Sequence, residues 1–161
     1  MFTKEITDIV WLQSKEFNLD PNFVLGIIQV ESSGSTFATR YEPEFFRKYI
    51  EGKKVEVFGA TKDTERVCRA TSFGLMQVMG QVARERGFRG AFLTALCNPQ
   101  LGIQYGCSHL AYLRSRLAVR GDASIASIAS AYNGGIGAVK GPGSFSNPEY
   151  PAKVLDAMPK G

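Results

Sequence analysis

The sequence predicts a mainly α-helical domain with one irregular insertion at about residues 35–71. Apolar residues recur at three- and four-residue spacings through most of the chain, which is the period of a helix buried on one face. A capping residue followed by proline, a typical helix start, occurs at Asp20-Pro21 and again at Asn98-Pro99. The helical period is lost within the insertion. A chain of 161 residues can bury a core of its own, so we predict one domain over residues 1–161.

The expected elements follow one another along the chain. The spacing of apolar residues predicts helices over 3–17, 21–31, about 72–87, 98 to about 117, 122 to about 133, and a last turn or two within 151–158. Inside the insertion, "EPEFFRKYIEG" suits a short helix and "KKVEVFG" suits a strand, so a small β-hairpin belongs to the expected fold. The stretch "GPGSFSNPEYP" is predicted to be a loop.

Composition and charge limit the classes of function. Hydrophobic residues make up 44% of the chain and charged residues 21%, as in soluble globular proteins. No apolar run approaches the ~18–20 residues of a membrane span, so we expect no membrane insertion. The net charge of +4 is uneven, because residues 1–34 carry −3 and residues 71–161 carry +5. A basic half suits an anionic polymer such as a cell wall, and the lack of a Lys/Arg-rich run argues against nucleic acid.

The N-terminus and the cysteines give less information about the function. "MFTKEITDIV" has acidic residues and no apolar core, so no signal peptide is expected, and work outside the cytoplasm would need another route of release. The three cysteines have no CxxC spacing, so a disulfide is neither implied nor excluded. Cys107 lies on an apolar stripe and is expected in the core. The chain has only one histidine, His109, which excludes a His-rich zinc site and is expected to be structural or solvent-facing.

Glu31 continues the apolar stripe of a predicted helix. Val24, Ile27 and Ile28 share its helix face, and Gly34 is a natural terminator. Partial burial disfavours a charged carboxylate, so we expect the pKa of Glu31 to rise from ~4.3 toward ~6. Such a group holds a proton near neutral pH and can donate it. From this stretch alone, a glutamate at a frayed helix end that reaches toward a lysine or arginine is an open alternative.

Three short stretches are informative when they are taken together and in their order along the chain. They are Glu31-Ser32, Gly74-Leu75-Met76-Gln77 and Ala131-Tyr132-Asn133, and each alone fits an ordinary core helix or helix end. Together they resemble the catalytic domain of the lytic transglycosylases, the branch of the lysozyme superfamily that includes goose-type lysozyme. "NPQLGIQYGCSHLAYL" and "NPEYPAKVL", which contains Tyr150, are similar to further stretches of that family. The resemblance covers about residues 18–158 and implies a lysozyme-like helical fold.

The resemblance also implies a reaction. The substrate would be the peptidoglycan glycan strand, and Glu31 would act as the catalytic acid that cleaves the MurNAc-GlcNAc β-1,4 bond and leaves 1,6-anhydro-MurNAc ends. No metal or cofactor would be needed, and the protein is expected to be a monomer. The family's pattern implies substrate-binding roles for Ser32, Ser72, Met76, Gln77, Met79, Tyr132, Asn133 and Tyr150. Phe73 and Tyr150 would offer platforms for sugar rings, and Tyr132 would hold Glu31 or an acetamido group.

Two alternatives stay open, and the first arises because the spacer between Glu31 and Gly74 is longer than in most members. Its "RYEPEFF" stretch resembles phage-type muramidases weakly. A hydrolytic muramidase would need a second acid, and the candidates in the insertion are Glu42, Glu44, Asp63 and Glu65. A non-catalytic wall-binding module is the other alternative, although a binder has no need of a half-buried acid. The expected place of action is the bacterial cell wall, in the periplasm or outside the cell, for a phage-released, virion-borne or otherwise exported protein.

Overall fold

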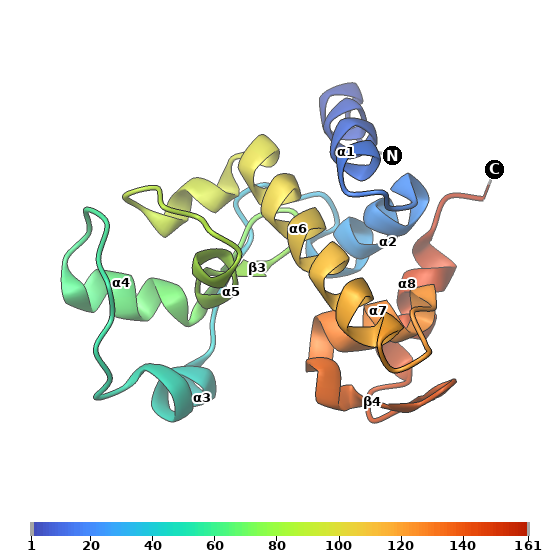
Figure 1. Cartoon of the computed structure of the whole chain (residues 1–161). Coiled ribbons are helices and arrows are strands. Elements are labelled where there is room, and N and C mark those ends of the chain that lie inside the picture. The colour runs from blue at the N-terminus through green and yellow to red at the C-terminus, as the bar shows by residue number, and fades with distance from the viewer. Residues whose placement is uncertain (1, 161) are drawn as a thin grey trace. The chain divides into compact units, whose positions relative to one another are not determined.

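The computed structural model describes residues 2–160, which form two compact units (Figure 1). The first unit contains the chain up to Ser33 and the chain from Cys107 onward, and the second contains Gly34–Gly106. Helix α6 (Pro99–Ala118) contributes its start to the second unit and its end to the first. The mainly helical class with small antiparallel sheets is confirmed. The expectation of a single domain over 1–161 stays a prediction.

The first unit is a helical bundle with a small hairpin. It consists of α1 (Lys4–Glu16), α2 (Pro21–Ser32), the end of α6, α7 (Ile125–Gly134), a 3-10 turn η3 (Ile136–Ala138), the hairpin β4 (Val139–Gly141) and β5 (Ser144–Phe145), and α8 (Glu149–Ala157). The side chains of Thr3, Asp20 and Ser124 cap α1, α2 and α7 by accepting from backbone N–H groups. The core residues of this unit are fully or almost fully buried: Val10, Phe23, Val24, Ile27, Ile28, Leu110, Leu117, Ile128 and Val154.

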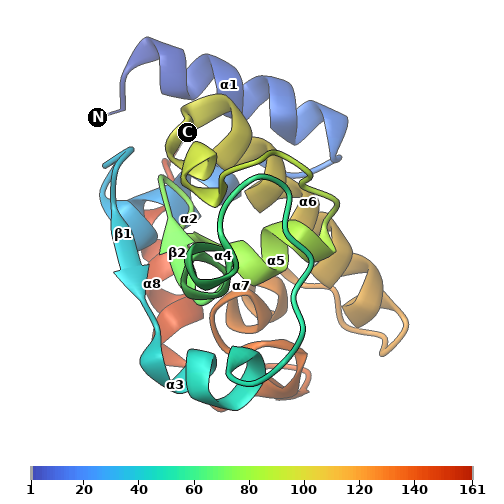
Figure 2. The same cartoon turned by 90° about the vertical axis from the view of Figure 1, so that its left-hand side faces the viewer.

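The second unit combines a three-stranded antiparallel sheet with short helices (Figure 2). The strands are β1 (Thr39–Tyr41), β2 (Thr71–Phe73) and β3 (Val78–Met79), in the order β1-β2-β3, with Arg40 opposite Ser72 and Ser72 opposite Met79. The helices are α3 (Pro43–Phe45), a π-helical turn η1 (Phe46–Ile50), α4 (Lys62–Arg69), α5 (Gly80–Glu85) and a 3-10 segment η2 (Leu93–Cys97).

The predicted helix over 72–87 is wrong in its first half. This stretch forms β2, a tight turn and β3 before a short helix, α5, begins. Gly74 and Gln77 adopt left-handed φ values of 75° and 47°, which no right-handed helix contains. A Cβ on Gly74 would lie 2.5 Å from the carbonyl oxygen of Leu96, so only glycine fits at this turn.

The insertion is more regular than expected. "EPEFFRKYIEG" does contain a short helix, formed by α3 and η1, but "KKVEVFG" forms no strand, and α4 was not predicted at all. The expected loop "GPGSFSNPEYP" contains β5 and the start of α8, and α7 begins at Ile125, with Ser124 as its cap, instead of at 122. Cys107 is buried, as expected, and all three cysteines are free thiols. No helix within residues 2–160 is both long and apolar enough to cross a membrane.

Candidate active site

Glu31 lies in the last turn of α2, at the end of a buried apolar stripe. Phe23, Ile27 and Ile28 on the same helix are fully buried, whereas Glu31 is half-buried, as the sequence predicts. The helix ends here because Ser33 adopts a left-handed conformation with φ 51°. The hydroxyl of Ser32 donates to the carbonyl oxygen of Ile28 at 3.2 Å, so this side chain also supports the helix end.

Helix α8 brings a phenol to Glu31. The hydroxyl of Tyr150 donates a hydrogen bond to Glu31 Oε1. Helices α2 and α8 pack closely at Gly26. A Cβ at this position would lie 2.9 Å from the carbonyl oxygen of Val154, so a larger residue would clash there. Gly26 lies against Val154, and Glu31, later on α2, contacts Tyr150, which is earlier on α8. The two helices therefore run antiparallel. Only 8% of Tyr150 and 3% of Phe73 is exposed, which is little surface for a sugar platform, and their predicted roles as platforms stay predictions.

The environment keeps two phenols protonated. Burial raises the pKa of Tyr150, and the charge of Glu31 and the hydrogen bond to it raise that pKa further. Burial also raises the pKa of Tyr132, at the end of α7, with smaller contributions from Glu31 and Cys107. The negative charge of Glu31 therefore acts on Tyr132 as well as on Tyr150. Both phenols are neutral hydrogen-bond donors at any physiological pH.

His109 packs against Tyr132 from α6. The imidazole stacks on the ring of Tyr112 with centroids 6.1 Å apart and lies tilted against Tyr132 at 5.7 Å. The sequence predicts a structural or solvent-facing place for His109 and no contact with Tyr132. The spacing along α6 gives no signal for this contact, because the partner residue lies on a different helix.

Asn133, at the end of α7, contacts Asn147, for which the sequence predicts no role. Asn133 is exposed, and its Oδ1 accepts a hydrogen bond from Asn147 Nδ2 at 2.9 Å. Asn147 also contacts Ser130, which is fully buried one turn earlier on α7. Asn147 begins the family-like stretch "NPEYPAKVL", in which the resemblance gives a role only to Tyr150, and the Asn-Pro pair itself is an ordinary turn signal.

The remaining predicted site residues lie in the second unit, each with contacts there. Ser72 on β2 and Met76 in the turn are buried, and Met79 on β3 is half-buried. A Cβ on Gly106 would lie 2.4 Å from the sulfur of Met76, so the thioether packs closely on α6. The amide nitrogen of Gln77 donates to the carbonyl oxygens of Ala38 at 2.8 Å and Gly74 at 3.1 Å, and so helps to hold the turn. Their substrate-binding roles stay predictions.

The candidate second acids of the insertion are all engaged with arginines. Glu42 Oε1 lies 2.5 Å from Arg40 Nε, and Glu44 forms an exposed ion pair with Arg47. Asp63 lies 3.6 Å from Arg66. These three carboxylates are surface groups whose roles in catalysis stay predictions.

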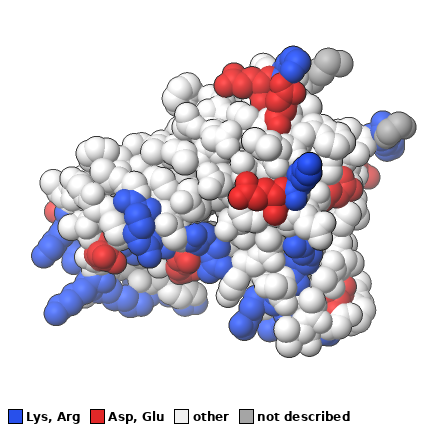
Figure 3. Space-filling view, turned by 45° about the horizontal axis from the view of Figure 1, so that its top comes forward, with Lys and Arg blue, Asp and Glu red and all other residues white. Residues whose placement is uncertain are grey.

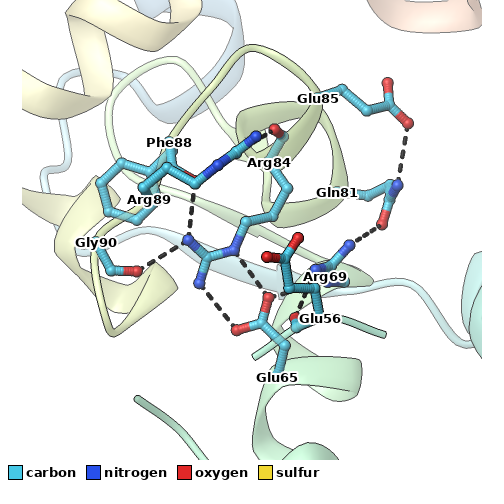
Figure 4. Close-up of polar contacts among 9 residues, drawn as sticks. All are labelled: Glu56, Glu65, Arg69, Gln81, Arg84, Glu85, Phe88, Arg89 and Gly90. Carbon is cyan, nitrogen blue, oxygen red and sulfur yellow. Dashed lines mark hydrogen bonds and ion pairs between the residues drawn. The ribbon is translucent and has the colours of Figure 1, made fainter. Parts of the chain in front are cut away.

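Glu65 is different, because it is buried with only 1% of its surface exposed. Arg84 donates to it from Nε at 2.8 Å and from Nη2 at 2.9 Å, and Arg69 Nε donates at 2.9 Å (Figure 4). Burial opposes the ionisation of Glu65, but the hydrogen bonds and charges of Arg84 and Arg69 outweigh it and lower the pKa. Glu65 is therefore a structural anion that joins α4 to α5.

Comparison with protein families gives a match over most of the chain. Residues 10–147 match the family model described as the transglycosylase SLT domain. This range contains Glu31, the turn around Gly74 and the end of α7. No curated protein matches the chain. The chain belongs to the transglycosylase SLT family, and it is therefore a lytic transglycosylase, an enzyme that cleaves glycosidic bonds of peptidoglycan.

Proposed function

We propose that Glu31 is the catalytic acid of this lytic transglycosylase, and that the enzyme cleaves the MurNAc-GlcNAc β-1,4 bond and leaves 1,6-anhydro-MurNAc ends. The observation that carries the proposal is the position of Glu31. It is a half-buried carboxyl group at the end of an apolar helix stripe, and the buried phenol of Tyr150 orients it. A carboxyl group placed in this way suits proton transfer, which requires a fixed geometry and a tunable pKa.

The reaction needs one carboxyl group in two successive roles. Protonated Glu31 donates its proton to the glycosidic oxygen as the bond from that oxygen to the muramic C1 breaks. A positively charged centre develops at C1, and the oxygen of the substrate's own acetamido group stabilises it. Ionised Glu31 then takes the proton of the C6 hydroxyl while that oxygen bonds to C1. The anhydro sugar forms, Glu31 is protonated again, and no water is consumed.

Tyr150 and Tyr132 support this cycle as neutral donors. Because their pKa values are raised, neither phenol competes with Glu31 as a source of protons. The hydrogen bond from Tyr150 fixes the carboxyl group and favours its ionised form between the two proton transfers. Burial favours the protonated form that starts the cycle. The raised pKa of Glu31 expected from the sequence stays a prediction, as does the monomeric state.

The test is mass spectrometry of the sugar ends released from purified peptidoglycan, with Glu31→Gln run beside the unchanged enzyme. We expect anhydro-muramic ends from the unchanged enzyme and a loss of at least ~10²-fold in the variant, in line with the usual contribution of general acid–base catalysis. The melting temperature of the variant should stay within a few degrees, because glutamine keeps the shape of the side chain.

Two results would contradict the proposal. Sugar ends that carry an added water would mean a hydrolase, and the search for its second acid would begin with Glu42 and Glu44. An active Glu31→Gln variant would remove Glu31 from the mechanism altogether. A folded but inactive variant that releases no ends agrees with the proposal.

A further inference from the structure

Asn147, in the segment between β5 and α8, is bonded to the end of α7 through three contacts within the first unit. Its Oδ1 accepts from the hydroxyl of Ser130 at 2.6 Å, and its Nδ2 donates to the backbone carbonyl oxygen of Ser130 at 3.1 Å. The same Nδ2 donates to Oδ1 of Asn133 at 2.9 Å. A Cβ on Gly134 would lie 3.0 Å from Nδ2 of Asn147, so the end of α7 fits closely against this amide.

These contacts determine which way both amides face. A backbone carbonyl only accepts hydrogen bonds, so the atom of Asn147 beside the Ser130 carbonyl must be nitrogen. The second hydrogen of that nitrogen points to Asn133, whose facing atom must then be an acceptor, the oxygen Oδ1. The amide nitrogen of Asn133 is therefore turned away from Asn147. Asn133 is exposed, and within residues 2–160 its Nδ2 has no hydrogen-bond partner.

We propose that Asn147 is a positioning residue that locks Asn133 with its N–H donors toward the substrate, where they bind a carbonyl oxygen. The proposal rests on the proposed function, because it names what this end of the first unit recognises on a peptidoglycan strand. A sugar hydroxyl can donate or accept, so it tolerates either orientation of Asn133. A carbonyl oxygen can only accept, so it is bound by the locked amide and rejected by a flipped one.

A peptidoglycan strand carries carbonyl oxygens in two places that a plain hydroxylated glycan lacks. One is the acetamido group of each sugar, and the other is the lactyl-peptide arm of the muramic acid. Both offer the same acceptor chemistry to Asn133. The locked amide therefore selects substituted amino sugars, and the experiment has to separate the two sources.

The test is the binding of glycan fragments to Asn147→Asp, measured by calorimetry in the Glu31→Gln background so that no turnover occurs. The new carboxylate has no N–H, so it cannot donate to Ser130 or to Asn133, and Asn133 turns its own N–H groups toward it. The probes are a glycan fragment with acetamido groups and stem peptides, the same fragment after de-N-acetylation, and a chitin fragment of the same length, which keeps the acetamido groups and lacks the whole lactyl-peptide arm. We expect the Kd of the intact fragment to rise about tenfold, the usual effect of one lost hydrogen bond to a buried or bound partner.

The pattern across the probes identifies the carbonyl. If Asn133 binds an acetamido group, the tenfold loss disappears with the de-N-acetylated fragment and persists with the chitin fragment. If it binds the lactyl-peptide arm, the reverse holds. Equal losses for all three fragments would overturn the proposal, because they would mean that Asn147 supports the fold and does not select a carbonyl.

A double-mutant cycle separates positioning from packing. In the Asn133→Ala background, Asn147→Asp should cause no further rise in Kd, since the residue through which Asn147 acts is gone. A further rise of the same size there would overturn the proposal. Asn147→Ala, which frees Asn133 without adding a charge, replaces the aspartate variant if that one does not fold, and the same selectivity is expected. Asn22→Asp on α2 is the matched control and should leave every Kd unchanged.

Failure of this proposal and failure of the proposed function are distinguishable. An enzyme that stays active as Glu31→Gln with Asn147 unchanged refutes the role of Glu31. An inactive Glu31→Gln enzyme in which Asn147→Asp weakens the binding of all three fragments equally refutes only the role of Asn147.

Discussion

At the scale of single residues, the pair formed by Glu31 and Tyr150 is the feature with the clearest chemical consequence. The phenol donates to one oxygen of the carboxyl group, and burial prevents the ring from moving away. Tyr150→Phe removes the donor and keeps the ring, so the fold should survive. Hydrogen bonds to charged groups contribute about 1.5–3 kcal/mol, so we expect kcat to fall roughly tenfold to hundredfold. The fall in kcat is measured from the rate at which anhydro sugar ends are released at saturating peptidoglycan.

The pH profile of the same variant distinguishes orientation from simple packing. Tyr150 favours the ionised form of Glu31, so its loss should move the limb of kcat/KM on which Glu31 loses its proton to higher pH. Tyr105→Phe is the matched control, because Tyr105 packs its ring on Phe88 in the second unit. An unchanged rate and pH profile in Tyr150→Phe would mean that the phenol does not assist Glu31.

At the scale of elements, α4 is held to α5 by a buried ion pair instead of by an apolar face. Glu65 on α4 accepts from Arg84 and Arg69, and Arg84 also donates to the carbonyl oxygens of Phe88 and Gly90 (Figure 4). The guanidinium group of Arg84 lies over the ring of Phe58 at 4.2 Å. Removing the carboxylate leaves a buried cation without its counter-ion, which costs about 3–5 kcal/mol.

Glu65→Gln should therefore lower the free energy of unfolding by about 3 kcal/mol at pH 7. The pKa of Glu65 is lowered in the folded protein, so its contribution to stability is present above the unfolded pKa of ~4.3 and is lost as pH falls through the folded pKa. Urea unfolding between pH 7 and pH 3 should show this loss in the unchanged protein and a flatter dependence in Glu65→Gln. Glu44→Gln, which breaks only an exposed pair with Arg47, should change stability by less than about 1 kcal/mol. Equal effects of the two variants would contradict the structural role of Glu65.

The same element explains where prediction from the sequence fails. Helices α1, α2, α6 and α7 are predicted by the helical spacing of their apolar residues, and Asp20 and Asn98 mark the starts of α2 and α6. Helix α4 has no such stripe, because the residue that it buries is Glu65. The hairpin of β2 and β3 has apolar residues at helical spacing, and only the left-handed backbone at Gly74 and Gln77 prevents a helix.

In the candidate site too, features set within one helix can be predicted from the sequence, and contacts between distant segments cannot. The half-buried position of Glu31 follows from its own helix, and the sequence predicts it. The partner Tyr150 lies 119 residues away, and Asn147 lies 14 residues from Asn133 across a hairpin. Spacing within one element cannot predict such contacts, because they depend on how separate helices pack.

At the scale of the whole molecule, charge is divided unequally between the two units. The second unit, Gly34–Gly106, holds eleven Lys and Arg residues against seven Asp and Glu, a net charge of +4. The rest of the chain holds eight of each and is neutral. Figure 3 shows Lys and Arg side chains outnumbering acidic ones on the visible face of the second unit. Because the stem peptides of peptidoglycan carry carboxylates, we expect the second unit to supply most of the electrostatic attraction to the wall.

The surface around Tyr49 on η1 is the place to test this expectation. Tyr49 is exposed, and the ammonium groups of Lys48 and Lys53 lie 5.1 Å and 5.8 Å from the centre of its ring. Reversing both charges with Lys48→Glu and Lys53→Glu should reduce the fraction of protein that sediments with purified peptidoglycan by several-fold at low salt. The difference from the unchanged protein should disappear near ~1 M salt, where the screening length is ~3 Å.

A matched double reversal in the first unit decides between surface and net charge. Lys4→Glu and Lys15→Glu on α1 change the net charge of the molecule by the same amount at exposed positions of the neutral unit. If the second unit provides the attraction, this control binds the wall almost as the unchanged protein does. Equal losses in the two double variants would show that wall binding follows the total charge of the molecule, and the division of charge between the units would then have no role in binding.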